Sequence, residues 1–225
     1  MDPGDDTIAR FHYQFATAAI HAINIARGVG SAKAIICENF EDIILERHDS
    51  KFDAIQVKTS DRHRPPFKLS DNAVEKSLIR FIKLNMKFPG QFSGFYFETN
   101  HEMWSDKENS QNAEWVINEI RRNPRVKGLR RTNGKRAAVD KLRVRSNAPV
   151  DVVVETLSKT NFRSRKEDVT SVHSLLHQAM LTHPQCCDLK YHRIIALSDA
   201  LIAAVFRASS RAQIAFSDRL YEVDG

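Results

Sequence analysis

The feature that most constrains the fold of this chain is a pair of short runs rich in branched apolar residues, separated by a tight turn. The runs are DIILER at 42–47 and FDAIQVKTS at 52–60, and Asp49-Ser50 lies between them. Aspartate and serine favour turns because their side chains hydrogen-bond to nearby backbone. With the turn at the centre, antiparallel pairing sets position 47 opposite 51 and position 42 opposite 56. The sequence therefore predicts a β-hairpin of defined register.

This register brings three polar side chains to one patch. Asp42 lies opposite Gln56, and directly paired residues have Cβ atoms roughly 4.5–5.5 Å apart. Lys58 shares a strand face with Gln56, because side chains two positions apart point the same way. Carboxylate and amide oxygens suit Mg²⁺, and a lysine beside them can orient or deprotonate a water that attacks a phosphodiester. The alternative is an exposed hairpin with a chance Asp–Lys ion pair, worth about 0–1 kcal/mol.

Other periodic segments flank the hairpin. Apolar residues at helical spacing predict helices over 7–27 and 72–87. Residues 150–157, VDVVVETL, are predicted as a late strand or as part of a mixed segment. The order of elements indicates an α/β core with a helical C-terminal part. Residues 33–37 and 42–47 are predicted to form separate strands or one bent strand, and residues 93–100 a further strand. Further helices are predicted at about 109–122, 167–182, 188–207 and 209–221.

Composition restricts the class of protein. No run of 18 or more apolar residues occurs, and the acidic N-terminus lacks the apolar stretch of a signal peptide. Cys37, Cys186 and Cys187 are too few for a disulfide framework, so we expect a reducing, cytoplasmic setting. The helical region 166–221 carries more apolar positions than one small core needs. We therefore expect most of them in the core and some on a face for a homo-oligomer or another partner.

Basic residues are concentrated in one segment. Residues 121–145 contain eleven Lys/Arg and one acid, Asp140, so their net charge is +10, whereas the whole chain carries +6. Such a patch favours a polyanion, and nucleic acid is the commonest one. The alternatives are a solvated loop or a docking surface for an acidic protein, with DNA then bound at the His63–Lys68 loop. The expected phosphate-binding residues are Arg121, Arg122, Arg125, Lys127, Arg130, Arg131, Lys135 and Arg136.

Histidine and cysteine residues near the C-terminus offer a different chemistry. His173 and His177 are four positions apart on a predicted helix, a spacing that can hold Zn²⁺. However, Cys186 and Cys187 are adjacent, and no CxxC pair is present. We therefore favour surface histidines and buried thiols over a zinc site. The same stretch also contains His183, Asp188 and His192.

The combination of Asp42 with Gln56-Val57-Lys58 resembles the catalytic motif of the PD-(D/E)XK nuclease superfamily, in the variant where glutamine replaces the second acid. Further strings make it similar to the dsDNA endonuclease domain of CD-NTase-associated (CBASS) effectors. Related domains occur with HerA-type ATPases and in other antiphage systems. The resemblance covers residues 4–60 well and 93–100 loosely. The strings are Gly4…Arg10-Phe11-x-Tyr13-Gln14, Glu38-x-x-Glu41-Asp42-Ile43 and Gln56-Val57-Lys58-Thr59.

The resemblance implies a restriction-endonuclease-like core, a mixed sheet flanked by helices, over residues 1–165, with 166–225 as a helical extension packed on it or used for assembly. It implies an Mg²⁺-dependent endonuclease, with Mn²⁺ as a substitute, that cuts double-stranded DNA with little sequence specificity in antiphage defence. Asp42 and Gln56 would hold the metal, and Lys58 would be the catalytic lysine. Glu38 or Glu41 would bind metal or support the ligands, and Gln14 would line the site from the first helix.

The resemblance also bears on regulation. A ligand-sensing domain follows the nuclease domain in the CBASS proteins, so we expect control by such a domain, fused or associated, or by a HerA-type ATPase. The alternative function is a non-catalytic nucleic-acid-binding or assembly module with the same fold. A helical adaptor built on residues 166–221 is a third reading of the pattern.

The basic segment generates a first prediction. Changing Arg130, Arg131, Lys135 and Arg136 together to Ala should lower the magnitude of the salt slope of duplex binding by about 3 to 4, because each neutralised phosphate contributes roughly −0.9. The loss should be similar for any DNA sequence, since phosphate contacts do not identify bases. Fluorescence anisotropy of a labelled duplex at several salt concentrations measures the slope. An unchanged slope would move the DNA-binding surface to the His63–Lys68 loop.

Overall fold

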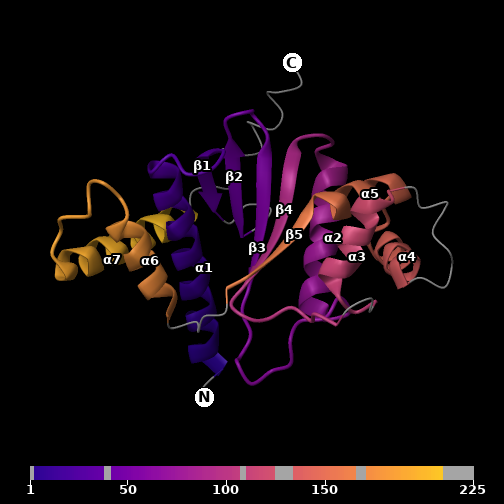
Figure 1. Ribbon diagram of the computed structural model, residues 1–225, viewed down its shortest axis with the longest axis horizontal. Helices are drawn as coiled ribbons and strands as arrows, with labels where there is room; N and C mark the ends of the chain where they lie inside the picture. The colour runs from indigo at the N-terminus through magenta and orange to yellow at the C-terminus, as the bar shows by residue number, and fades with distance from the viewer. Residues whose placement is uncertain (1–2, 38–41, 107–109, 125–133, 166–170, 210–225) are drawn as a thin grey trace. The chain divides into compact units, whose positions relative to one another are not determined.

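The structure is a computed structural model that describes residues 3–37, 42–106, 110–124, 134–165 and 171–209 (Figure 1). Contacts divide the chain into two compact units, one of residues 1–59 with 167–225 and one of residues 60–166. Among the described helices, none is long and apolar enough to cross a membrane.

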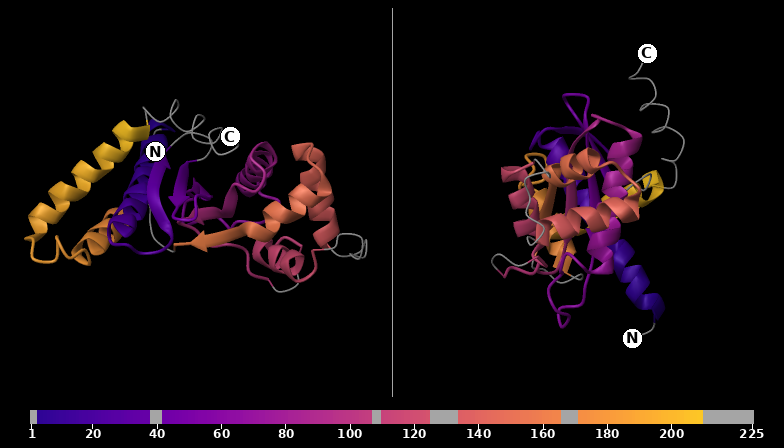
Figure 2. Two further views of the ribbon diagram at one scale, coloured as in Figure 1. Left: turned by 90° about the horizontal axis from the view of Figure 1, so that it is seen from above. Right: turned by 90° about the vertical axis from the view of Figure 1, so that its right-hand side faces the viewer.

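The first unit contains a three-stranded antiparallel sheet and three helices. The strands are β1 (Ala32–Cys37), β2 (Ile43–Arg47) and β3 (Phe52–Lys58), and β2 pairs with both of the others. Helix α1 (Pro3–Ala26) packs against β1 and β3. Helices α6 (Val172–Leu181) and α7 (Tyr191–Ser209) pack against α1, beside which Figure 2 shows them. The residues that α1 buries include Tyr13, Ala16, Ala19 and Ile20.

The β2–β3 hairpin has the predicted register. Ile43 pairs with Ile55 and Glu46 pairs with Phe52, so extending the ladder by one position sets residue 42 opposite 56. Ser50 lies in the turn with a φ of 61°, a left-handed conformation that suits a tight reversal. Positions 33–37 and 42–47, which the sequence left as either one bent strand or two, form the separate strands β1 and β2.

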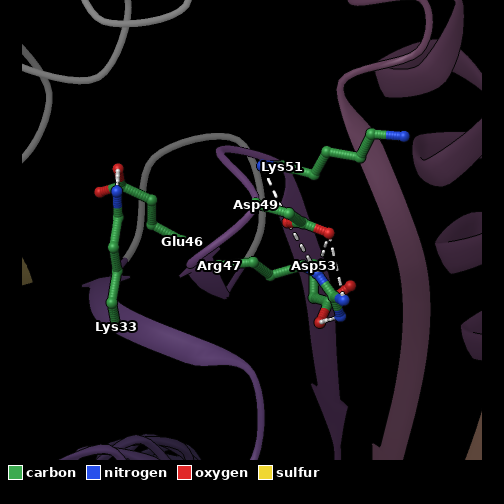
Figure 3. A network of polar contacts seen from close by, with 6 residues as sticks. All are labelled: Lys33, Glu46, Arg47, Asp49, Lys51 and Asp53. Atoms are coloured by element: carbon green, nitrogen blue, oxygen red, sulfur yellow. Dashed lines mark hydrogen bonds and ion pairs between the residues drawn. The ribbon is translucent and has the colours of Figure 1, made fainter.

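A polar network fixes the tip of this hairpin (Figure 3). Arg47 Nε donates to Asp49 Oδ1 at 3.2 Å, and Arg47 Nη1 lies 3.3 Å from Asp53 Oδ2. The bond from Arg47 lowers the pKa of the Asp49 carboxyl and raises the pKa of the guanidinium. Lys33 Nζ lies 3.0 Å from Glu46 Oε1 and ties β1 to β2. Together these contacts favour the observed register, because a shift of either strand by one residue would separate the ion pairs.

The second unit has two parallel strands and four helices. β4 (Phe92–Thr99) pairs with β5 (Thr160–Ser164), with Phe95 opposite Thr160 and Phe97 opposite Phe162. Phe81, Phe92, Phe95 and Phe97 are fully buried and form its aromatic core. Helix α5 runs directly into β5 at Thr160. The helices are α2 (Asn72–Lys87), α3 (Ala113–Arg122), α4 (Gly134–Ser146) and α5 (Val150–Lys159).

The α/β fold class is confirmed, and so are the helix at 72–87 and the strand near 93–100, observed as α2 and β4. The prediction of a strand at 150–157 is wrong, because these residues form helix α5. Its valines suit a strand, but packing against α2, α3 and α4 buries Val153, Val154 and Leu157 on one helical face. Strand β5 and helix α4 were not predicted. The helix expected at 209–221 lies almost wholly outside the described residues.

The compact units divide the chain differently from the expected boundary between residues 165 and 166. Helices α6 and α7 belong with residues 1–59, while residues 60–166 form the other unit. The apolar positions of α7 split between two environments. Ile194, Ile202 and Val205 are buried, whereas Ile195, Leu197 and Phe206 are exposed.

His177 on α6 generates a prediction about pH and stability. Burial lowers the pKa of His177 below its ordinary value of 6.5, His173 lowers it further, and Asp199 opposes both. The unfolded chain therefore binds more protons than the folded chain between the two pKa values, so this contribution is complete above the ordinary value and is lost as the pH falls. His177 Nδ1 also lies 3.2 Å from the Tyr191 hydroxyl.

His177→Asn should therefore reduce the loss of unfolding free energy between about pH 7.5 and pH 5.5, as measured by urea titration. The matched control is His192→Asn on α7, where the imidazole is exposed. A pH dependence that His177→Asn leaves unchanged would contradict the assignment.

Candidate active site

The three predicted polar residues meet at one oxygen atom. Asp42 Oδ2 accepts a hydrogen bond from the backbone N–H of Val57 at 2.7 Å and one from the Gln56 side-chain amide. Lys58 Nζ lies 3.6 Å from the same oxygen. Asp42 precedes β2 directly, whereas the three donors belong to consecutive residues of β3. The hairpin register alone therefore brings the carboxylate to its partners.

Burial explains why a strand of this kind carries an amide and an ammonium. Gln56 is completely buried, and a buried amide requires hydrogen-bond partners, one of which Asp42 supplies. Lys58 follows at the end of the strand, where its side chain is 30% exposed, while that of Asp42 is 17% exposed. The cluster therefore has a buried side, at Gln56, and a side that a substrate can reach, at Lys58.

The donor chemistry at Asp42 fits a small hard cation. An Asp42 carboxylate and a Gln56 amide provide oxygen ligands, and Mg²⁺ in proteins is usually held by one or two carboxylates together with water and substrate phosphates. Nowhere in the described ranges do three His, Cys, Asp or Glu side chains gather to hold a metal. The zinc alternative near His173 and Cys186 therefore gains no support among the residues that the structure describes.

Of the three remaining predicted catalytic residues, the structure describes Gln14 but not Glu38 or Glu41. Glu38 and Glu41 lie outside the described residues. Gln14 lies on α1, which packs against β3, and its side chain is half-buried. The roles of these three residues stay predictions.

Several cations of the basic segment are engaged within the protein. The Arg121 guanidinium donates to Ser158 O at 2.8 Å, to Asn161 Oδ1 at 2.8 Å and to Thr160 O, so it holds the junction of α5 and β5. Arg122 pairs with Glu119 at 3.0 Å, and Arg136 pairs with Asp140 at 3.6 Å. Lys135 lies in the first turn of α4. Arg125, Lys127, Arg130 and Arg131 fall outside the described residues.

Helix α4 contains a contact that sequence reasoning missed. Lys141 Nζ and Arg145 Nη1 lie 3.2 Å and 2.5 Å from the same oxygen of Glu75, a carboxylate that is only 4% exposed. Lys141 and Arg145 are four positions apart, the spacing that places two side chains on one face of a helix, and this spacing was visible in the sequence. These two cations therefore dock α4 on α2. The segment is not a uniform solvated loop, and its role in binding DNA stays a prediction.

Comparison with known proteins gives a consistent picture. A family model described as "Cap4, dsDNA endonuclease domain" matches residues 2–185. Among curated protein sequences, none matches the chain. The chain is similar to the structure of the Moraxella osloensis Cap4 SAVED/CARF-domain containing receptor, at 13% identity and a TM-score of 0.50, covering 88% of this chain and 43% of that one.

Two structures of the Acinetobacter baumannii Cap4 receptor, which has the same description, are also similar. One contains the cyclic trinucleotide 2′3′3′-cAAA and has 15% identity, a TM-score of 0.53 and coverage of 89% and 41% of the two chains. The other has 14% identity, a TM-score of 0.54 and coverage of 89% and 42%. The chain thus spans about two-fifths of the length of these receptors and shares the fold of that part. Since the family model covers most of its residues, the chain belongs to the Cap4 dsDNA endonuclease domain family.

Proposed function

We propose that this chain is a metal-dependent endonuclease domain that hydrolyses double-stranded DNA with little sequence specificity. The observation that carries the proposal is the convergence of Gln56, Val57 and Lys58 on Asp42 Oδ2. It occurs in a chain of the Cap4 dsDNA endonuclease domain family. An ion pair on an idle surface would not need a fully buried amide as a third member.

In this proposal Asp42 and Gln56 would hold Mg²⁺, or Mn²⁺ in its place, with Glu38 or Glu41 as a further ligand or a supporting group. The bound ion would polarise the scissile phosphate and lower the pKa of a water molecule. As an ammonium, Lys58 would orient that water and offset the negative charge that develops on the phosphate, whereas the alternative role of deprotonating the water would require the neutral amine. Its contact with Asp42, at 3.6 Å, holds the ammonium at the site before substrate arrives. Gln14 lines the same site from α1.

Low sequence specificity follows from the kind of contacts proposed. Arginine and lysine side chains that bind phosphates position a duplex without identifying its bases. In this proposal the basic residues of 121–136 provide such contacts. DNA held in this way is cleaved wherever a phosphate reaches Asp42 and Lys58.

Control of such an activity is proposed to come from another domain or protein. The similar structures are of receptors described as containing a SAVED/CARF domain, and one of them holds a cyclic trinucleotide. We therefore propose a nucleotide-sensing domain, fused or associated, as the regulator of an antiphage effector in the cytoplasm. A HerA-type ATPase is the alternative partner, and the exposed residues Ile195, Leu197 and Phe206 of α7 are candidates for homo-oligomer contact.

Lys58→Ala tests the catalytic role of the lysine. Loss of a positioned catalytic group costs about 10²–10⁴ in rate, so linearisation of plasmid DNA with Mg²⁺ should slow by that factor. Duplex affinity should change little, because most phosphate contacts lie elsewhere. Lys51→Ala, at the exposed tip of the same hairpin, is the control and should cleave like the wild type. Wild-type cleavage by Lys58→Ala would exclude this lysine, and no cleavage by the wild type, with or without EDTA, would favour a non-catalytic module.

Asp42→Asn tests the metal-binding role of the carboxylate. The variant should lose metal-dependent cleavage and bind Mg²⁺ or Mn²⁺ more weakly in calorimetric titration, because an amide carries no charge. It should still fold, since the Asn side-chain oxygen can accept from the Val57 N–H as Asp42 does. Asp188→Asn, at an exposed position between α6 and α7, is the matched control. Equal metal affinity in Asp42→Asn and the wild type would transfer the ligand role to Glu38 or Glu41.

A further inference from the structure

The chain that follows β3 makes a closed turn. Arg64 N donates to Asp61 O at 3.1 Å, and His63 N donates to the Asp61 side-chain oxygen Oδ1 at 3.0 Å. These two bonds define a four-residue reversal, here called the 61–64 turn. Arg62 and His63 occupy its centre, and the side chains of Arg62, His63 and Arg64 are all exposed.

Buried side chains hold both ends of the 61–64 turn. Asn100 accepts from Ser60 N at 2.9 Å and donates to Ser60 O at 3.0 Å, so a single amide satisfies the backbone of that residue. His101 Nε2 lies 2.8 Å from Arg64 O and 3.2 Å from Pro65 O. Because both neighbours are acceptors, this nitrogen carries a proton and donates. Asn100 is 5% exposed and His101 8% exposed, so the contacts are shielded from water.

The segment after the turn is fixed as well. Phe67 N donates to Glu102 O, and Trp104 N donates to Phe67 O, each at 2.8 Å. The Phe67 ring packs edge-on against Phe97 of the aromatic core, with 5.7 Å between ring centroids. A loop of this length that contains no helix or strand is therefore held at several points along its backbone.

The arginine side chains of this turn contrast with those of Arg121 and Arg163 in the same unit. In the described part of the chain, neither Arg62 nor Arg64 forms an ion pair or a side-chain hydrogen bond with another described residue. Arg121 instead donates to four residues of α3, α5 and β5, and Arg163 is held between Glu98 at 2.8 Å and the Tyr96 ring at 3.9 Å. The turn thus combines a fixed backbone with two cations that pair with no other side chain among the residues that the structure describes.

Chain connectivity places this turn near the catalytic lysine. Arg62 follows Lys58 by four residues, and four residues span at most about 14 Å when fully extended. Successive phosphates on one strand of a duplex are separated by about 3.4 Å along the helix axis. The Cα atoms of Lys58 and Arg62 therefore lie within about 14 Å of each other, which corresponds to roughly four phosphate steps, and the length of each side chain adds to this separation.

From these observations we infer that the 61–64 turn is a second DNA-binding element, in which Arg62 and Arg64 contact backbone phosphates that flank the scissile one. This inference rests on the proposed endonuclease function and adds residues outside 121–145 to the DNA-binding surface. Arginine suits the role because its guanidinium donates two parallel hydrogen bonds to phosphate oxygens. The fixed backbone lowers the entropy lost on binding, because the cations are presented before the duplex arrives. Asp61 accepts from His63 N through Oδ1 and keeps its negative charge, so the formal charge of the 61–64 turn is +1 with His63 neutral.

The test is a comparison of paired variants for duplex binding in EDTA, where no cleavage occurs. Arg62→Gln with Arg64→Gln should reduce the magnitude of the salt slope by about 1.8, because each phosphate contact contributes about 0.9. At about 0.15 M salt the same change weakens affinity by about 30-fold. Arg62→Lys with Arg64→Lys should recover most of the slope, because it restores the charge. Lys190→Gln with Arg193→Gln removes the same charge from exposed positions near α7 and should leave the slope unchanged.

The result can separate this inference from the function on which it rests. A wild-type chain that neither binds duplex DNA nor cleaves it with Mg²⁺ would contradict the endonuclease proposal itself. If the wild type cleaves and the Arg62/Arg64 glutamine pair retains the wild-type slope and affinity, the 61–64 turn is not a DNA contact. A loss of slope that the lysine pair does not recover would show that the substitutions act through the fold, and would equally overturn the inference.

Discussion

The site depends on one constraint, the antiparallel register of β2 and β3. With Ile43 opposite Ile55, Asp42 is carried to the edge of the ladder beside the amide of Gln56, the N–H of Val57 and the ammonium of Lys58. A shift of the register by one residue would exchange the two faces of the strand and would move Gln56 and Lys58 away from the carboxylate. The polar contacts of Arg47 at the hairpin tip therefore support the site from a distance, through the alignment of the strands.

The hairpin was predictable because its determinants are local. Alternating side chains, a turn of polar residues and a count of positions from Asp49 were enough to place Asp42 opposite Gln56. Helix α5 was not predictable by the same means, because VDVVVETL satisfies the preferences of a strand and its burial against α2 and α4 depends on distant sequence. Helix α4 was not predicted because its sequence is dominated by charged residues. Among its described residues, Val139 and Leu142 are the only long apolar side chains that are buried.

The anchors of the 61–64 turn illustrate what sequence patterns omit. Asn100 follows Ser60 by forty positions, and a polar pair at such a distance has no periodicity to identify it. His101 resembled any other histidine in the sequence, yet its ring holds two backbone carbonyls. Buried polar side chains that satisfy loop backbone are thus a class of determinant that appears only once the fold is known.

The buried Glu75 alters what the composition of the chain implies about approach to a polyanion. Its carboxylate offsets charge from Lys141 and Arg145, and Glu119 does the same for Arg122, although both acids lie outside residues 121–145. The field that a distant duplex experiences is therefore weaker than the formal charge of the segment indicates. Electrostatic steering by uncompensated charge raises association rates, and it declines with ionic strength. For any polyanion that approaches this segment, the encounter rate would be governed by the cations that have no acidic neighbour, and a count of lysine and arginine in the sequence would overstate it.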